Sequence, residues 1–153
     1  MTNNAPRFVF LDLEETIIDS WSSRLLVNVE KIRRVIDPTD KLGVFSFAIW
    51  TDSDHREFTN NIRPTLERVL GNVIETTPTA QTMMQIDTEL TGVRWESITD
   101  FISIRGKVGA FTNFCSVLKF EHAVLIDDVV PNIRINNLDT DQIIDFINVG
   151  NLV

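Results

Sequence analysis

Cysteine, histidine and basic residues are all scarce in this chain of 153 residues. The single cysteine, Cys115, excludes an internal disulfide bond and is compatible with a reducing compartment. With only two histidines and no Cys–His spacing, the sequence argues against a zinc site. The 14 lysines and arginines are outnumbered by 22 acids, and the net charge of −8 argues against a broad basic surface for nucleic acid.

Long apolar runs and targeting segments are also missing. No run approaches the length that spans a membrane, and the N-terminal MTNNAPR is polar, unlike a signal peptide. We therefore expect a cytoplasmic protein without a membrane partner. Apolar residues make up 43% of the chain, enough for one core, and no repeat, low-complexity segment or linker divides it. Residues 1–153 are predicted to form a single domain.

The most informative stretch is FVFLDLEETIID (residues 8–19), an apolar run that ends in Asp12, Glu14 and Thr16 at alternate positions. Alternate side chains of a buried strand face the same side, so this run predicts two carboxylates and a hydroxyl together at a strand's carboxyl end. Parallel α/β sheets bind their ligands in that crevice. The alternative is a strand followed by an acidic, N-cap-like turn that binds nothing.

A second apolar run, HAVLIDDVVPN (residues 122–132), ends in the paired acids Asp127 and Asp128. Two acidic clusters at two strand ends need a cation between them, because adjacent carboxylates otherwise raise each other's pKa and lose their charge. Ligand sets made only of oxygen suit magnesium better than zinc. The two runs together predict a Mg²⁺ site.

With these motifs, most of the chain resembles the haloacid dehalogenase (HAD)-like superfamily of phosphotransferases, in particular its small capless phosphatases. FLDLEET is close to the DxDxT form of the family, with Asp12 at the nucleophile's position. The apolar run VFSFAIW ends in Thr51, where the family has a phosphate-binding Ser or Thr. Lys107 in RGKVGAF matches the family's lysine, and LIDDVVPN places Asp127 and Asp128 in the acidic metal-binding positions.

The resemblance implies a magnesium-dependent phosphomonoester hydrolase that acts through an aspartyl-phosphate on Asp12. Glu14 would serve as acid and base and would give its backbone carbonyl to the metal. Asp127 would orient Lys107 or the metal's waters. The candidate catalytic residues are thus Asp12, Glu14, Thr51 and Lys107, with Thr51 and Lys107 also binding substrate, and the candidate metal ligands are Asp12, Glu14, Asp127 and Asp128.

Glu14 departs from the family pattern, which has Asp two positions after the nucleophile. Its extra methylene moves the carboxyl by more than about one ångström, a misplacement that can cost roughly a hundredfold in rate. A non-catalytic binding or regulatory protein with the same fold is therefore the alternative function. A receiver domain of the response-regulator type is contradicted by the order of the motifs, since its acidic pair lies on the first strand.

Hydrophobic patterns predict strands over residues 7–13, 44–50 and 72–77, in the run before Asp127, and at an edge over 133–135. They predict helices over 30–36, from 52 toward Gly71 with a break at Pro64, over 79–90, 95–104 and 107–119, and from near Thr140 with its isoleucines inward. The expected fold is α/β, a three-layer α/β/α sandwich with a mainly parallel, Rossmann-like sheet. Cys115 is expected to be a buried helix residue rather than a catalytic thiol.

The expected sandwich has little or no cap, because fewer than about thirty residues separate Thr16 from Val44 and the segment between Thr77 and Lys107 is only slightly longer. As the resemblance implies, an open site favours a phosphoprotein or another exposed phosphoester, or else a cap supplied by a second subunit. Acidity ranks nucleic acid lower as a partner. Trp21 either covers the site or packs, and His55 either caps a helix at the surface or contacts substrate.

Overall fold

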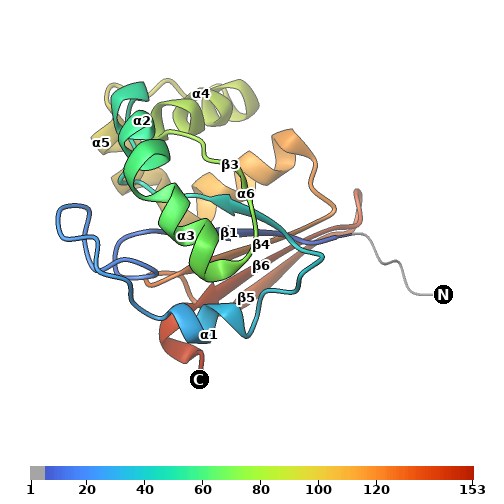
Figure 1. Cartoon of the computed structure of the whole chain (residues 1–153). Coiled ribbons are helices and arrows are strands. Elements are labelled where there is room, and N and C mark those ends of the chain that lie inside the picture. The colour runs from blue at the N-terminus through green and yellow to red at the C-terminus, as the bar shows by residue number, and fades with distance from the viewer. Residues whose placement is uncertain (1–5) are drawn as a thin grey trace.

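The computed structural model describes residues 6–153 as a six-stranded sheet with helices on both faces (Figure 1). The strands are β1 (Phe8–Leu11), β2 (Lys41–Val44), β3 (Ile74–Thr76), β4 (His122–Asp127), β5 (Ile133–Asn137) and β6 (Gln142–Asn148). Their order is β3-β2-β1-β4-β6-β5, and every neighbouring pair is parallel except β5 with β6. The α/β class and the mainly parallel sheet are thus as predicted.

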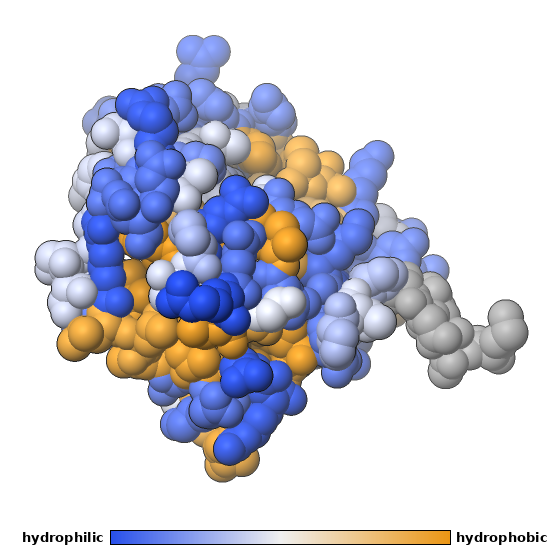
Figure 2. Space-filling model, viewed as in Figure 1, coloured by the Kyte–Doolittle hydropathy of each residue, from blue (hydrophilic) through white to orange (hydrophobic). Residues whose placement is uncertain are grey.

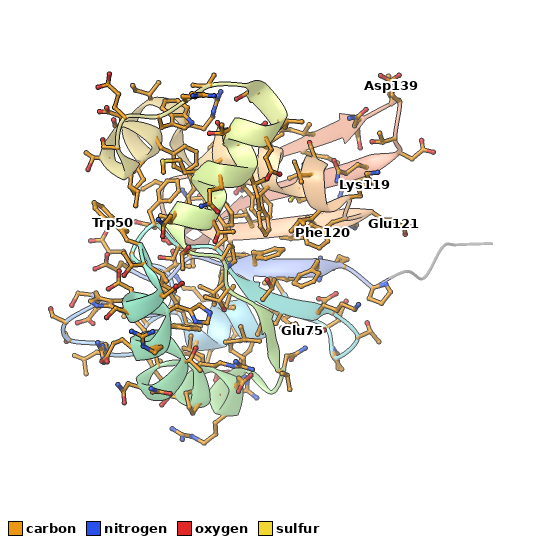
Figure 3. The ribbon with its side chains drawn as sticks, turned by 90° about the horizontal axis from the view of Figure 1, so that it is seen from above. Trp50, Glu75, Lys119, Phe120, Glu121 and Asp139 are labelled. Carbon is orange, nitrogen blue, oxygen red and sulfur yellow. The ribbon has the colours of Figure 1, made fainter. Side chains whose placement is uncertain are left out.

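Helices form a layer on each side of the sheet (Figure 3). They are α1 (Val29–Arg33), α2 (Asp52–Asn61), α3 (Arg63–Leu70), α4 (Ala80–Thr91), α5 (Ile98–Asp100), the π-helix η1 (Phe101–Arg105), α6 (Gly106–Leu118) and the short 3-10 helix η2 (Val149–Asn151). On one face Val9 and Leu11 of β1 pack with α1, α2 and α3, and on the other Phe10 packs with α4, η1 and α6. Alternate residues of one strand therefore build two cores, as the three-layer prediction requires.

The core on the α6 face is rich in phenylalanine. Phe10 contacts the rings of Phe45, Phe111 and Phe114 edge-on, at centroid distances of 6.5, 5.3 and 5.7 Å. Gly43 of β2 lies directly beside Phe10 in the strand pairing. A Cβ at this glycine would lie 2.6 Å from the ring, so the aromatic core itself requires the missing side chain.

The carboxyl ends of β1, β2 and β4 lie at the same edge of the sheet, because these strands are parallel and adjacent. Asp12 follows β1 directly and continues its pairing, with its backbone N–H donating to the carbonyl of Ile126 at 3.0 Å. Asp127 is the last residue of β4, and Ser46 lies two residues beyond the end of β2. Three separate parts of the sequence thus deliver polar side chains to one place.

Two predicted elements are wrong. The predicted helix after Thr140 is strand β6, in which Gln142, Ile144 and Phe146 are buried in alternation, the period of a strand. β-Branched isoleucines favour this extended form, and β6 gains a parallel pairing with β4 and an antiparallel one with β5. The predicted strand 44–50 instead ends at Val44 and is followed by a loop, so β2 begins and ends earlier than its apolar run.

Other boundaries differ less. The first strand ends at Leu11 rather than residue 13, and the predicted helix 95–104 is the short α5 followed by the π-helix η1. The break near Pro64 is present, with Ile62 between α2 and α3, and α3 ends at Leu70, followed by the cap residue Gly71 in a left-handed conformation. Residues 77–107 fold onto the sheet as part of the α6-side layer, with Met83 and Phe101 in its core. This agrees with the prediction of little or no cap.

The segment between β1 and α1 forms a small hairpin, joined by bridges of Ile18 to Glu14 and to Leu26. Apolar surface gathers on the face of Figure 2 around α1 and this segment. Within the described part of the chain, no helix has the length and apolar character needed to cross a membrane.

Candidate functional site

Asp12 is buried at the centre of the carboxyl edge of the sheet. Its Oδ1 lies 2.9 Å from the ammonium of Lys107, and its Oδ2 accepts a hydrogen bond from the hydroxyl of Thr16 at 3.2 Å. The same hydroxyl lies 3.4 Å from Oδ1 of Asp128. The predicted meeting of residues 12 and 16 is therefore present, but a turn produces it, since the N–H of Ile17 donates to the carbonyl of Leu13.

Lys107 reaches this site from the first turn of α6. Its ammonium lies 2.9 Å from Asp12 and 3.0 Å from Oδ2 of Asp127, and its side chain is only 7% exposed. It also lies 4.7 Å from the ring centroid of Phe47, within the range of a cation–π interaction. The lysine chosen from the sequence thus lies between the two acidic strand ends.

Another buried carboxylate, that of Asp87 in α4, anchors the segment that precedes Lys107. Asp87 pairs with Arg105 at 2.8 Å and accepts hydrogen bonds from Asn113 at 2.6 Å and from the indole of Trp95 at 2.9 Å. Arg105 ends η1, two residues before Lys107. This network could not be predicted from the sequence, because its members share no motif.

The acidic pair at the end of β4 is held by backbone and amide groups. Asp127 is fully buried, and its Oδ1 accepts a hydrogen bond from the N–H of Val129 at 2.8 Å. The side-chain amide of Asn148, at the end of β6, donates to the carbonyls of Asp128 and Val130 at 3.2 and 2.8 Å. The end of β6 therefore fixes the loop that carries Asp128.

Burial and like charge act together on this cluster. Burial raises the pKa of Asp12, Lys107 opposes the shift, and Asp128 adds to it. Burial lowers the pKa of Lys107, but the charges of Asp12 and Asp127 outweigh this effect, so its pKa is raised overall. Burial and the charge of Asp127 raise the pKa of Asp128. The carboxylates thus hold more negative charge than one ammonium neutralises.

The donor set fits a hard divalent cation. Asp12, Asp127 and Asp128 each offer a carboxylate oxygen, and these oxygens lie within 4.8 Å of one another. With Lys107 included, the cluster keeps a formal charge of two negative units, which a divalent ion balances. The buried Oδ2 of Asp127 has no hydrogen-bond partner among the described residues, although Lys107 lies 3.0 Å away. Oxygen ligands of this kind are those that Mg²⁺ prefers.

Glu14 lies at the same site but outside the carboxylate cluster. Its side chain is exposed, and its Oε2 accepts a hydrogen bond from the backbone N–H of Trp21 at 2.9 Å. Trp21 itself packs against the α2-side core and under the guanidinium of Arg24. Of the two alternatives for Trp21, its side chain packs, while its backbone holds the candidate acid–base residue.

Thr51 lies outside the cavity that contains Asp12 and Lys107. It is exposed and forms the N-cap of α2 in a reciprocal capping box with Asp54. Ser46, five residues earlier, lines the cavity instead and is buried. The run VFSFAIW suggested a strand that ends at Thr51, but because β2 ends at Val44, the first hydroxyl after the strand is that of Ser46.

The site opens into a cavity of about 540 Å³. Its floor carries Asp12, Lys107, Asp127 and Asp128, and its walls are largely apolar. Cys115, by contrast, is buried in the α6-side core, where burial raises the pKa of its thiol, so it is the buried helix residue that was predicted.

Comparison of the chain with protein-family models, with curated proteins and with solved structures gave no match. The geometry of this cavity is therefore the basis for the functional assignment.

Proposed function

We propose that this protein is a magnesium-dependent phosphomonoester hydrolase of the HAD-like type, with Asp12 as its nucleophile. The observation that carries the proposal is the buried pair of Asp12 and Lys107, 2.9 Å apart, in one cluster with Asp127 and Asp128 at the carboxyl edge of a parallel sheet. This edge is where α/β folds bind phosphorylated ligands. Carboxylates with one cation and a divalent-metal donor set suit transfer of a phosphoryl group.

Asp12, Asp127 and Asp128 would hold Mg²⁺, with the carbonyl of Glu14 as a further ligand. When bound, the ion supplies positive charge to the phosphate oxygens. Lys107 supplies a second positive charge from the chain itself. Ser46, whose Oγ accepts a hydrogen bond from the N–H of Ala48 at 3.1 Å, keeps its own proton for donation to a phosphoryl oxygen. We assign to Ser46 the phosphate-binding role that the family resemblance implies for Thr51.

The chemistry takes two steps. A carboxylate oxygen of Asp12 attacks phosphorus and forms an acyl phosphate, while the bond from phosphorus to the ester oxygen breaks and Glu14 gives that oxygen a proton. Glu14, now a carboxylate, takes a proton from water as the water oxygen attacks phosphorus. The acyl phosphate bond breaks, which releases inorganic phosphate and restores both carboxyl groups to their starting states.

The exposed cavity favours a phosphoester displayed on a larger molecule, such as a phosphoprotein, or a small phosphoester that needs no enclosing cap. A non-catalytic binding protein is the second candidate, and one observation favours it. The hydrogen bond from Trp21 to Glu14 holds the acid–base carboxylate at the surface. A glutamate fixed in this way would bind at the site's edge without transferring protons.

Release of inorganic phosphate from a panel of phosphomonoesters in the presence of Mg²⁺ tests the proposal. We expect turnover by the native chain, at least about a thousandfold less turnover by Asp12→Asn, and unchanged turnover by Asp139→Asn, which alters an exposed aspartate between β5 and β6. The same turnover in Asp12→Asn as in the native chain would refute the mechanism. Absence of turnover in the native chain, with activity in Glu14→Asp, would support the binding protein instead.

A further inference from the structure

The walls of the cavity are apolar where a substrate would enter. Phe47, Ala48 and Trp50 come from the loop after β2, Ile102 from η1 and Val129 from the loop after β4. Trp50 and Val129 are 40% and 71% exposed, although both are large apolar residues next to a charged site. Exposed apolar surface that borders a polar cavity is typical of a binding site.

Charge in the same cavity limits what can bind beside the reacting phosphate. Among the described residues that line it, Lys107 is the one cation, and it is already paired with Asp12 and Asp127. Glu14 and Glu15 add two exposed carboxylates. A second phosphate on the substrate would meet repulsion without a partner, so diphosphates and nucleic-acid backbones fit this site poorly.

Trp50 is held in place by its backbone. Its N–H donates to the carboxylate of Asp54 in α2 at 3.1 Å, and its carbonyl accepts a hydrogen bond from the N–H of Gln81 in α4 at 3.3 Å. Figure 3 shows Trp50 at the opposite end of the sheet from Lys119, Glu121 and Asp139. The backbone of Trp50 is therefore anchored near the N-termini of two helices at the edge that carries the site, so its backbone needs little further ordering when a ring stacks on the indole.

We propose that this site selects aromatic phosphomonoesters, in which a single phosphate is carried on a benzene ring that packs against Trp50 and the neighbouring apolar wall. The inference rests on the proposed function and names its substrate class. The phosphate binds at Lys107, and the ring packs on the apolar wall, where an alkyl or charged group would gain less binding free energy. A phosphotyrosyl side chain and a free aryl phosphate share this chemistry.

Binding of phosphonates that cannot be hydrolysed tests the preference separately from turnover. Isothermal titration calorimetry with Mg²⁺ would compare benzylphosphonate, cyclohexylmethylphosphonate and methylphosphonate on the native chain and on Trp50→Ala, Trp50→Phe and Leu138→Ala. Leu138 is 89% exposed between β5 and β6, outside the cavity. We expect benzylphosphonate to bind about tenfold more tightly than methylphosphonate, as a stacked ring of this kind would give.

The preference should disappear in Trp50→Ala and persist in Trp50→Phe and Leu138→Ala. Cyclohexylmethylphosphonate should bind more weakly than benzylphosphonate, because it lacks an aromatic face. Equal affinities on the native chain, or a preference that survives Trp50→Ala, would overturn the inference. If the aromatic preference is refuted but methylphosphonate binds, the phosphate site and the proposed function remain. If none of the phosphonates binds, the aromatic preference and the proposed function both fail.

Turnover then separates the two sources of the ring. A phosphotyrosine peptide with a higher kcat/KM than phenyl phosphate identifies a protein substrate, and a lower value identifies a free aryl phosphate. A phosphoserine peptide hydrolysed as fast as the phosphotyrosine peptide would overturn the aromatic preference.

Discussion

Replacement of Lys107 by methionine should destabilise the fold strongly, and Mg²⁺ should reverse part of the loss. Lys107 lies within 3.0 Å of two carboxylates, and Asp127 is fully buried. Methionine keeps an unbranched side chain but removes the ammonium. The variant would keep three acidic groups in contact with no cation from the chain among them.

Loss of one partner from a buried ion pair costs about 3–5 kcal/mol, a large part of a typical stability of about 5–15 kcal/mol. Urea unfolding at neutral pH in EDTA, followed by tryptophan fluorescence, measures this loss. Lys41→Met is the matched control, because Lys41 is an exposed lysine at the start of β2 and the expected change is within about 0.5 kcal/mol.

Magnesium at about one hundred times its dissociation constant should stabilise a folded chain that binds it by about 2.7 kcal/mol. We expect a larger gain for Lys107→Met than for the native chain at the same concentration, since the variant's cluster carries one more unneutralised charge. If Lys107→Met loses no more stability than Lys41→Met, the reasoning about the buried pair is wrong. If Mg²⁺ stabilises neither chain, the cluster is not a metal site.

Three further predictions concern titration, the acid–base residue and the sheet. In EDTA, Asp12→Asn should gain stability relative to the native chain as the pH rises above 3.8, because the raised pKa of Asp12 means that the folded native chain binds more protons than the unfolded one. Urea unfolding of both chains across this pH range checks this prediction, and a difference in unfolding free energy that does not change with pH would contradict it. Glu14→Gln should slow hydrolysis of an alkyl phosphate more than that of phenyl phosphate in steady-state assays, since a phenol, with a pKa of about 10 like that of tyrosine, leaves more easily without a proton. An equal loss of rate for the two substrates would exclude Glu14 as the acid. Gly43→Ala should lower the free energy of unfolding by about 1–3 kcal/mol, because its Cβ would lie 2.6 Å from the ring of Phe10; an unchanged melting temperature in calorimetry would refute this.

The parts of the site that sequence reasoning found are those in which an apolar run ends in acids. Asp12 and Asp127 each follow such a run, and parallel pairing of β1 with β4 brings them to one edge. Lys107 could be placed as well, because a helix start upstream of the second acidic strand brings its ammonium toward that edge. Local pattern and sheet topology agree at these positions, so the sequence sufficed.

Sequence reasoning failed where an apolar run continued beyond its strand. Phe45 and Phe47 extend the hydrophobic pattern past Val44, yet they fill the α6-side core from a loop. Apolar character marks burial, which loops next to a core share with strands, so the run alone gave the wrong end for β2 and pointed to Thr51 rather than to Ser46, which lines the cavity. In β6 the error concerned the type of element, because a strand was predicted to be a helix. The isoleucines fit a helix face and a strand equally in a short run, and only pairing with β4 decides between them.

The acidic cluster is more consistent with a role in binding than with one in stability. Asp127 is fully buried, and its Oδ2 lies 3.0 Å from Lys107. Burial raises the pKa of Asp12 and of Asp128, and the nearby carboxylates Asp128 and Asp127, respectively, add to these two shifts. Burial of charge in this arrangement costs stability that well-packed apolar residues would not cost. Asp87 differs, because its oxygens have partners on η1, on α6 and at Trp95 in the loop after α4. Three carboxylates that share one buried lysine are therefore the feature expected of a site completed by a cation and a phosphorylated ligand.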